Sequence, residues 1–92
     1  MRLDLFLKTS RLVTRRSLAQ QFCDEGLIEV NGFTAKSSKD IKAGDRISIK
    51  RRDRVTVVAV TTIPEKKQIP KTEAERLFRI ESDLGLPGDT LA

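Results

Sequence analysis

The side chains of this sequence that are best suited to chemistry are the cations near its start. No acidic residue occurs between positions 8 and 16, and four basic residues lie there: Lys8, Arg11, Arg15 and Arg16. Guanidinium and ammonium groups donate strong, charge-assisted hydrogen bonds to phosphate oxygens. A cluster of them with no carboxylate between them predicts a surface that binds a polyanion.

The rest of the composition argues against catalysis. The 92 residues include no histidine, tryptophan or tyrosine, and Cys23 is the only cysteine. The sequence therefore lacks the most common general base, the usual metal ligands and the means to form an internal disulfide. We expect no enzyme activity, no metal and no cofactor. We expect Cys23 to be a buried, unreactive thiol on the apolar side of a helix.

The net charge of +5 is unevenly distributed along the chain. Residues 1–52 carry twelve basic and six acidic side chains, whereas residues 53–92 carry six and seven. This asymmetry favours one polyanion-binding side of the molecule; the alternative is an ordinary surface on which lysines only maintain solubility. The apolar runs are too short to span a membrane, and the N-terminus lacks the shape of a signal peptide. We expect a cytoplasmic protein without membrane contact.

Two short helices are expected to hold the cations in place. Apolar residues recur at helical spacing on both sides of the cluster, and they predict helices over about residues 3–8 and 15–25. Thr14 is a suitable N-cap for the second helix, and Gly26 is typical of the residue that ends a helix. The cluster therefore surrounds the predicted turn: Lys8 ends the first helix, Arg11 lies in the turn, and Arg15 and Arg16 begin the second helix.

The second predicted helix begins with two cations. The helix macrodipole disfavours Arg15 and Arg16 in the first turn by about 0.3–1 kcal/mol each. Residues that break a local rule in this way often belong to a functional site, and free N–H groups beside two guanidinium groups would form an anion receptor. The alternative is that both arginines are simply exposed to solvent.

A β-hairpin is expected to follow the helices. Asn31-Gly32 between β-forming residues is a strong hairpin signal, because a type I′ turn needs a positive φ at both central positions. With this turn, four apolar side chains are expected to face inward together: Ile28, Val30, Phe33 and Ala35.

The remaining residues complete the predicted architecture. Strands are expected over residues 46–50 and 55–60, a linker over 63–70, a C-terminal helix over 71–84 and a flexible tail over 85–92. The predicted fold class is α+β, with two short N-terminal helices packed on a small, mostly antiparallel β-sheet, plus the C-terminal helix. Residues 1–62 would form the main domain.

This order of elements resembles the S4-type RNA-binding domain, also called the αL motif. The similarity covers roughly residues 1–52 and rests on MRLDLFLKTSRLVTRRSLAQQFCDEGLIEVNG, followed by DIKAGDRI. Within this family the chain is most similar to the small stand-alone bacterial members of the RqcP type. Its start at the motif, its short length and the lack of an attached catalytic domain favour that subgroup.

The resemblance implies a role on obstructed large ribosomal subunits. Family members of this type bind the large subunit when a peptidyl-tRNA blocks it, which implies contacts with large-subunit rRNA and with the P-site tRNA. The resemblance also implies a functional partner, a fibronectin-binding-like protein of the NFACT family that recruits alanyl-tRNA and extends C-terminal tails on stalled chains. We expect a monomer that supports this ribosome-associated quality control.

The resemblance also assigns the RNA-binding residues. Four of them would lie at the RNA surface and two would flank it: Arg2, Asp4, Arg15 and Arg16, with Lys8 and Arg11 beside them. Asp4 has three possible roles: to orient a neighbouring arginine, to accept a hydrogen bond from RNA, or to be a plain helix acid favoured by the dipole. Leu5 departs from the family, in which a basic residue is common at that position.

Three alternatives to this function remain open. A heat-shock relative of the same domain type also handles peptidyl-tRNA on free large subunits, although its C-terminal extension is basic and residues 72–92 here are acidic on balance. A helix-turn-helix DNA-binding protein would need a third, supporting helix. A fragment of an RNA-modifying or aminoacylating enzyme would need a catalytic domain. All four phenylalanines are expected on inward faces, which favours recognition of RNA shape over stacking on single strands.

Overall fold

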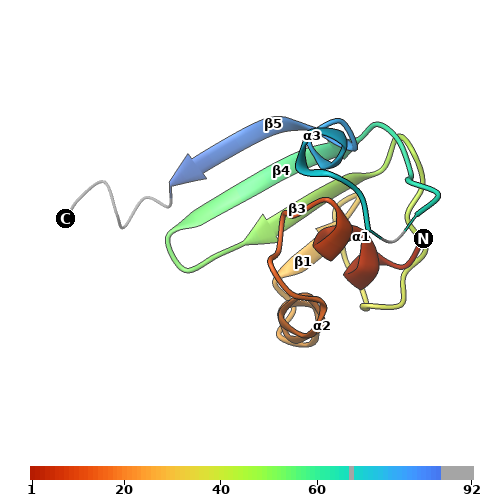
Figure 1. Cartoon of the computed structure of the whole chain (residues 1–92). Helices are drawn as coiled ribbons and strands as arrows, with labels where there is room; N and C mark the ends of the chain where they lie inside the picture. The colour runs from red at the N-terminus through yellow and green to blue at the C-terminus, as the bar shows by residue number, and fades with distance from the viewer. Residues whose placement is uncertain (67, 86–92) are drawn as a thin grey trace.

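The computed structural model of the protein describes residues 1–66 and 68–85 (Figure 1). Its elements in chain order are α1 (Leu3–Thr9), α2 (Arg16–Asp24), β1 (Ile28–Val30), β2 (Phe33–Thr34), β3 (Arg46–Lys50), β4 (Arg54–Val60), α3 (Lys71–Ala74) and β5 (Phe78–Gly85). The predicted α+β fold, with two short N-terminal helices and a small antiparallel sheet, is confirmed. In the described part of the chain, no helix is long and apolar enough to cross a membrane.

The five strands form one sheet in the order β2-β1-β3-β4-β5, and each neighbouring pair is antiparallel. Side chains on β3 alternate strictly, so that Ile47 and Ile49 are buried while Arg46 and Lys50 are exposed. On the outer face, Lys50 forms an ion pair with Glu29 of β1 at 2.6 Å. The sheet therefore has one apolar face and one face with charged side chains.

Helices α1 and α2 pack against the apolar face of the sheet, and Figure 1 shows the β3–β4 turn and the end of β5 extending past them. Helix α1 has only seven residues and would not be stable alone. Its Leu3, Phe6 and Leu7 side chains are completely buried, and each contributes about 1.5–3 kcal/mol of hydrophobic free energy. This burial fixes α1, and with it the residues that α1 presents to solvent.

Helix α2 ends as the sequence predicts, but it does not begin as predicted. Gly26 has a φ of +74°, and the N–H of Leu27 donates to the carbonyl of Phe22 at 2.9 Å, which closes the helix in a Schellman arrangement. The expectation that Thr14 caps the helix is wrong. Arg15 is the N-cap, and no side-chain hydrogen bond caps it.

The β1–β2 hairpin has the predicted register. Asn31 and Gly32 have φ values of +53° and +87°, as a type I′ turn requires, and Val30 pairs with Phe33. The expectation that Phe33 is buried is wrong, because its side chain is 78% exposed. It lies on the same side of the sheet as buried Val30, but β2 is the edge strand and the helices do not cover it.

The predicted C-terminal helix over residues 71–84 is wrong beyond Ala74. The helix α3 has four residues, no side-chain bond caps it, and Phe78–Gly85 is a strand paired with β4. The register of this pair shifts between Val57 and Val58, so that Glu81 is an extra residue in a β-bulge. The bulge hides the alternation of the strand in the sequence, and hydrogen bonding to the free edge of β4 outweighs local helix propensity. The expected tail falls mostly on residues 86–92, outside the described residues.

Candidate nucleic-acid interface

The carboxylate of Asp4 lies at the centre of a cluster formed by α1 and α2. Its side chain is completely buried, and it accepts hydrogen bonds from the Nε and Nη2 atoms of Arg2, both at 3.2 Å. From α2 it accepts bonds from Arg16 Nε at 3.3 Å and from Gln20 Nε2 at 2.8 Å. The backbone N–H of Leu5 donates to it at 2.8 Å. Asp4 therefore joins the two helices and orients two arginines.

The ionised state of Asp4 follows from its hydrogen bonds. Burial of the side chain raises the pKa of this carboxyl, but the hydrogen bonds from Gln20, Arg2, Arg16 and the Leu5 N–H lower it by more, so the pKa lies below its ordinary value. Asp4 is therefore negatively charged at neutral pH. The expectation that it lies at the surface is wrong, and of its three possible roles the geometry matches the orientation of neighbouring arginines.

Arg2 and Arg16 remain available to a ligand although both bind Asp4. Their side chains are 48% and 42% exposed. A guanidinium group has five N–H donors, and the bonds to Asp4 use two from Arg2 and one from Arg16. The other donors can bind phosphate oxygens, and their directions are set before the ligand arrives.

Asp4 also supplies the negative charge that the first turn of α2 lacks. The first turn of α2 contains no acidic residue, and it begins with Arg16 directly after the N-cap Arg15. The buried carboxylate of α1 lies against Arg16 and Gln20, one turn apart on α2. This contact offsets the unfavourable placement of Arg16 in the helix dipole.

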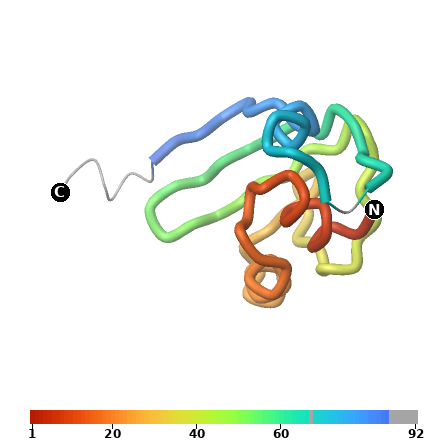
Figure 2. Tube along the Cα trace, in the orientation of Figure 1, coloured from red at the N-terminus to blue at the C-terminus, as the bar shows by residue number. Residues whose placement is uncertain are grey.

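Lys8 and Arg11 lie apart from the Asp4 cluster. Together with Thr14, Ile69 and other residues, they line a hollow of about 480 Å³ beside the turn that joins α1 and α2. Figure 2 shows this turn running beside the segment that leads into α3, and Arg11 Nη2 donates to the carbonyl of Ile69 at 3.3 Å. Arg11 has a φ of +66°, a conformation that favours glycine, where it ends α1. The Arg11 side chain therefore uses one of its donors to hold the segment before α3 in place.

Arg15 lies in a third place. It is exposed, and it lines a hollow of about 500 Å³ with Ser17, Leu18 and Gln21. The structure therefore brings Arg2, Asp4 and Arg16 together. It distributes Lys8, Arg11 and Arg15 over the flanking surface.

Two residues that position the site were not anticipated. Gln20 donates the shortest side-chain bond to Asp4, and its spacing of four residues from Arg16 could have placed it on the same helical face. Arg51, from the β3–β4 turn, donates to the carbonyl of Leu12 at 2.8 Å and fixes the turn between the helices. No sequence pattern indicates that contact, because it joins segments 39 residues apart.

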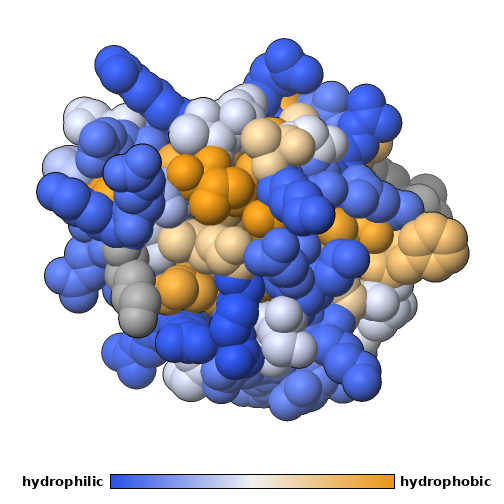
Figure 3. All heavy atoms as spheres, turned by 90° about the vertical axis from the view of Figure 1, so that its right-hand side faces the viewer, coloured by the Kyte–Doolittle hydropathy of each residue, from blue (hydrophilic) through white to orange (hydrophobic). Residues whose placement is uncertain are grey.

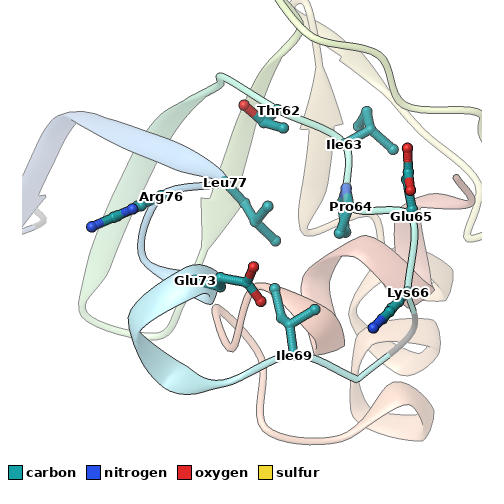
Figure 4. Close-up of a pocket in the computed structure, with 9 residues that line it drawn as sticks. All are labelled: Thr62, Ile63, Pro64, Glu65, Lys66, Ile69, Glu73, Arg76 and Leu77. Atoms are coloured by element: carbon teal, nitrogen blue, oxygen red, sulfur yellow. The ribbon is translucent and has the colours of Figure 1, made fainter.

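A separate hollow lies between α3 and the segment before it. Figure 3 shows an irregular apolar band on this side of the molecule, with hydrophilic side chains around it. The hollow has a volume of about 530 Å³, and Figure 4 shows Ile69 and Leu77 directed toward it, whereas Arg76 points away. Within residues 1–66 and 68–85, no group of acidic or cysteine side chains could hold a metal ion.

Comparison with known proteins agrees with the fold. The family model of the S4 domain matches residues 1–47, which include α1, α2, β1, β2 and the Asp4 cluster. The heat shock protein 15 of Vibrio cholerae, whose structure is described as trimeric, has a TM-score of 0.79 with this chain at 29% identity. The match covers 89% of this chain and 82% of that one. The fold and the family model therefore define an S4-type domain.

Two curated relatives make the assignment more specific. The RQC P-site tRNA stabilizing factor of Bacillus subtilis is 41% identical over 87 residues, which are 92% of this chain and 99% of that protein. The protein of the same name from Halalkalibacterium halodurans is 40% identical over 83 residues, 90% of this chain and 92% of the relative. The chain belongs to the family of RQC P-site tRNA stabilizing factors.

Proposed function

We propose that this chain is a non-enzymatic RNA-binding factor that stabilises the P-site tRNA on obstructed large ribosomal subunits during ribosome-associated quality control. The observation that carries the proposal is the Asp4 cluster, in which a buried carboxylate holds two half-exposed guanidinium groups on the helical face of an S4 domain. The names of the relatives, which are P-site tRNA stabilizing factors, support the choice of ligand.

The mechanism follows from the fixed geometry of the cluster. A flexible arginine loses conformational entropy when it binds phosphate, and Asp4 has already restricted Arg2 and Arg16 in the free protein. Helix α2 begins without a side-chain cap, so N–H groups of its first turn can also face an anion. Such a surface recognises the backbone of folded RNA, because the deep groove of A-form RNA hides the base edges.

The proposed setting has further parts. Large-subunit rRNA and the P-site tRNA would both contact the helical face, with Arg15, Lys8 and Arg11 beside the Asp4 cluster. The protein would act as a monomer in the cytoplasm, next to an NFACT-family protein that adds alanine tails. The names of the relatives support the P-site tRNA contact in this setting, and a tRNA held in the P site carries the chain that a tailing reaction extends.

A second candidate is recycling of free large subunits that still carry peptidyl-tRNA. The similarity to the heat shock protein of Vibrio cholerae favours it. The higher identity to the quality-control relatives, 40–41% against 29%, supports the first function. The helix-turn-helix alternative receives no support, because a β-hairpin rather than a third helix follows α2.

Co-sedimentation with purified large ribosomal subunits at several salt concentrations tests the proposal. Arg15→Ala and Arg16→Ala should each weaken binding and reduce the log–log salt slope by about 0.7–0.9 for each phosphate that is no longer neutralised. Arg79→Ala, which removes an exposed cation from β5, should leave both quantities unchanged. Binding of both helix variants at the wild-type level would show that α2 is not the RNA surface.

The same two variants should differ in stability. Arg16→Ala removes a partner of the buried Asp4 carboxylate and should lower the free energy of unfolding by about 1–2 kcal/mol. Arg15→Ala removes an exposed charge and should leave the free energy of unfolding unchanged.

To separate the two candidate functions, stalled chains should be examined in cells that lack the protein. Loss of C-terminal alanine tails supports quality control, and intact tails support recycling.

A further inference from the structure

Of the four phenylalanines, all of which the structure describes, Phe33 alone is exposed, and it lies on the helical side of the sheet. Its side chain is 78% accessible, at the tip of the β1–β2 hairpin. A hollow of about 380 Å³ lies beside it, within the size range of ligand sites, and Val30, Ala35, Lys36 and Lys39 contribute to its lining. An aromatic ring is therefore presented to solvent with two lysine residues beside the same hollow.

The hairpin tip is held rigidly. The backbone N–H of Asn31 donates to the carbonyl of Arg46 at 2.8 Å, and its side-chain oxygen accepts from the Arg46 N–H at 3.0 Å. Its amide nitrogen donates to Asp45 at 3.1 Å, and Asp45 also accepts from the N–H of Lys42 at 2.9 Å. Because the backbone that carries Phe33 is fixed, only the two side-chain torsions of the ring need ordering when a flat ligand stacks on it.

The charge beside the ring fits RNA better than protein. Lys36 and Lys39 are exposed, and among the residues that the structure describes no carboxylate forms an ion pair with either. The nearby Asp40 binds the N-terminal ammonium group at 2.9 Å. Protein interfaces are depleted of lysine, whereas single-stranded RNA sites combine aromatic rings with cations.

This surface is continuous with the Asp4 cluster. The N–H of Leu3 donates to the carbonyl of Lys39 at 2.7 Å, and the N–H of Asp4 donates to that of Ser37 at 3.1 Å. The loop that carries the lysines therefore packs directly against the start of α1, next to Arg2.

We infer that the hairpin tip is a second RNA contact, in which the Phe33 ring stacks on an unpaired nucleobase while Lys36 and Lys39 bind the adjacent phosphates. The inference rests on the proposed function, because it extends the RNA surface of α1 and α2 around the edge of the sheet. It gives the protein a contact that detects a splayed-out base in addition to the shape of folded RNA.

The test is the dissociation constant for purified large ribosomal subunits, measured over a salt series. Phe33→Ala should raise it by about 5- to 150-fold, the range for loss of one aromatic stack, without a change in salt slope. Phe33→Trp should preserve binding, and Phe33→Leu should not, because an aliphatic side chain cannot stack. Lys36→Ala and Lys39→Ala should each reduce the slope by about 0.7–0.9. Leu84→Ala, which removes a comparably exposed apolar side chain from β5, is the matched control.

The chain has no tryptophan, so Phe33→Trp also provides a single fluorophore. Protein-free large-subunit rRNA with tRNA should quench its emission. Binding by Phe33→Ala at the wild-type level overturns the inference, and so does full rescue by Phe33→Leu, which would indicate an apolar protein contact. If Arg16→Ala loses binding while Phe33→Ala binds normally, the inference about the hairpin tip is overturned, but the proposed function is not. Absence of wild-type binding overturns the proposed function as well.

Discussion

Replacement of Asp4 by asparagine tests whether the buried carboxylate organises the interface. The new side chain would nearly conserve the volume and keep one acceptor, which the Leu5 N–H can use. Its amide group would face Gln20 Nε2 and Arg16 Nε, both donors, at positions now 2.8 and 3.3 Å from a carboxylate oxygen. The amide N–H groups of the asparagine would therefore meet the N–H groups of Gln20 and Arg16, so that neither side can accept a hydrogen bond. The substitution also removes the negative charge that pairs with the guanidinium groups of Arg2 and Arg16.

The expected loss of stability can be worked out from these contacts. A hydrogen bond to a charged group contributes about 1.5–3 kcal/mol, and a donor left without a partner in a buried site costs about 1–3 kcal/mol. Arg2 and Arg16 are about half exposed, so water replaces part of what they lose. We expect a decrease of about 2–3 kcal/mol in the free energy of unfolding, or about 10–20 °C in Tm for a domain of this size.

The pH dependence of the same pair of proteins adds a second readout. The pKa of Asp4 is lowered in the folded state, so its contribution to stability is present above the ordinary carboxyl pKa of about 3.9 and is lost as the pH falls toward the folded value. Urea denaturation followed by circular dichroism should show the full difference between wild type and Asp4→Asn at pH 7. The difference should shrink below about pH 4.

Asp24→Asn is the matched control, because it removes an exposed carboxylate from the other end of α2. It should leave the free energy of unfolding within about 0.5 kcal/mol of wild type. If Asp4→Asn were as stable as wild type at pH 7, the cluster would not hold α1 against α2. If it lost stability but kept full affinity for large subunits, the orientation of Arg2 and Arg16 would not matter for RNA binding.

Two further predictions concern α2. Burial and then the charges of Asp4 and Asp24 raise the pKa of Cys23 from 9.0 to about 11, so alkylation by iodoacetamide at pH 7.5 should be at least about 100-fold slower in the folded protein than in urea. Equal rates would contradict its burial. Gly26→Ala should cost about 1–2 kcal/mol in chemical denaturation through the positive φ alone, since a Cβ there meets nothing within 4 Å. Gly85→Ala, whose Cβ would make only an ordinary 3.7 Å contact, should cost much less.

The sequence was most informative where local and tertiary preferences agree. Asn31-Gly32 determined both the turn and the register of its hairpin, and Gly26 ended α2 as expected. The cationic residues around the first two helices were identified from their types and spacing. The conformation of a tight turn or a helix end depends mainly on residues within a few positions of it. A short window of sequence is therefore enough to predict it.

The errors arose where distant segments decide the outcome. Residues 78–85 join the sheet because β4 offers an unpaired edge, and the bulge at Glu81 conceals the strand period. Phe33 is on the same side of the sheet as the buried Val30, as the alternation predicts. The helices do not reach the edge strand β2, so the Phe33 side chain stays exposed. Asp4 was assigned to the RNA surface through the resemblance to the S4 family. Its burial depends on Gln20, which approaches from the other helix.

The edges of the sheet have a consequence for the behaviour of the folded chain at high concentration. An exposed edge strand can add strands from other molecules and so initiate aggregation. Here β2 has only two residues, and β5 carries a bulge next to Arg79, Glu81 and Asp83. A short edge on one side, and a twisted, charged edge on the other, both oppose strand addition. We therefore expect the folded chain to resist fibril formation even though one face of its sheet has no helical cover.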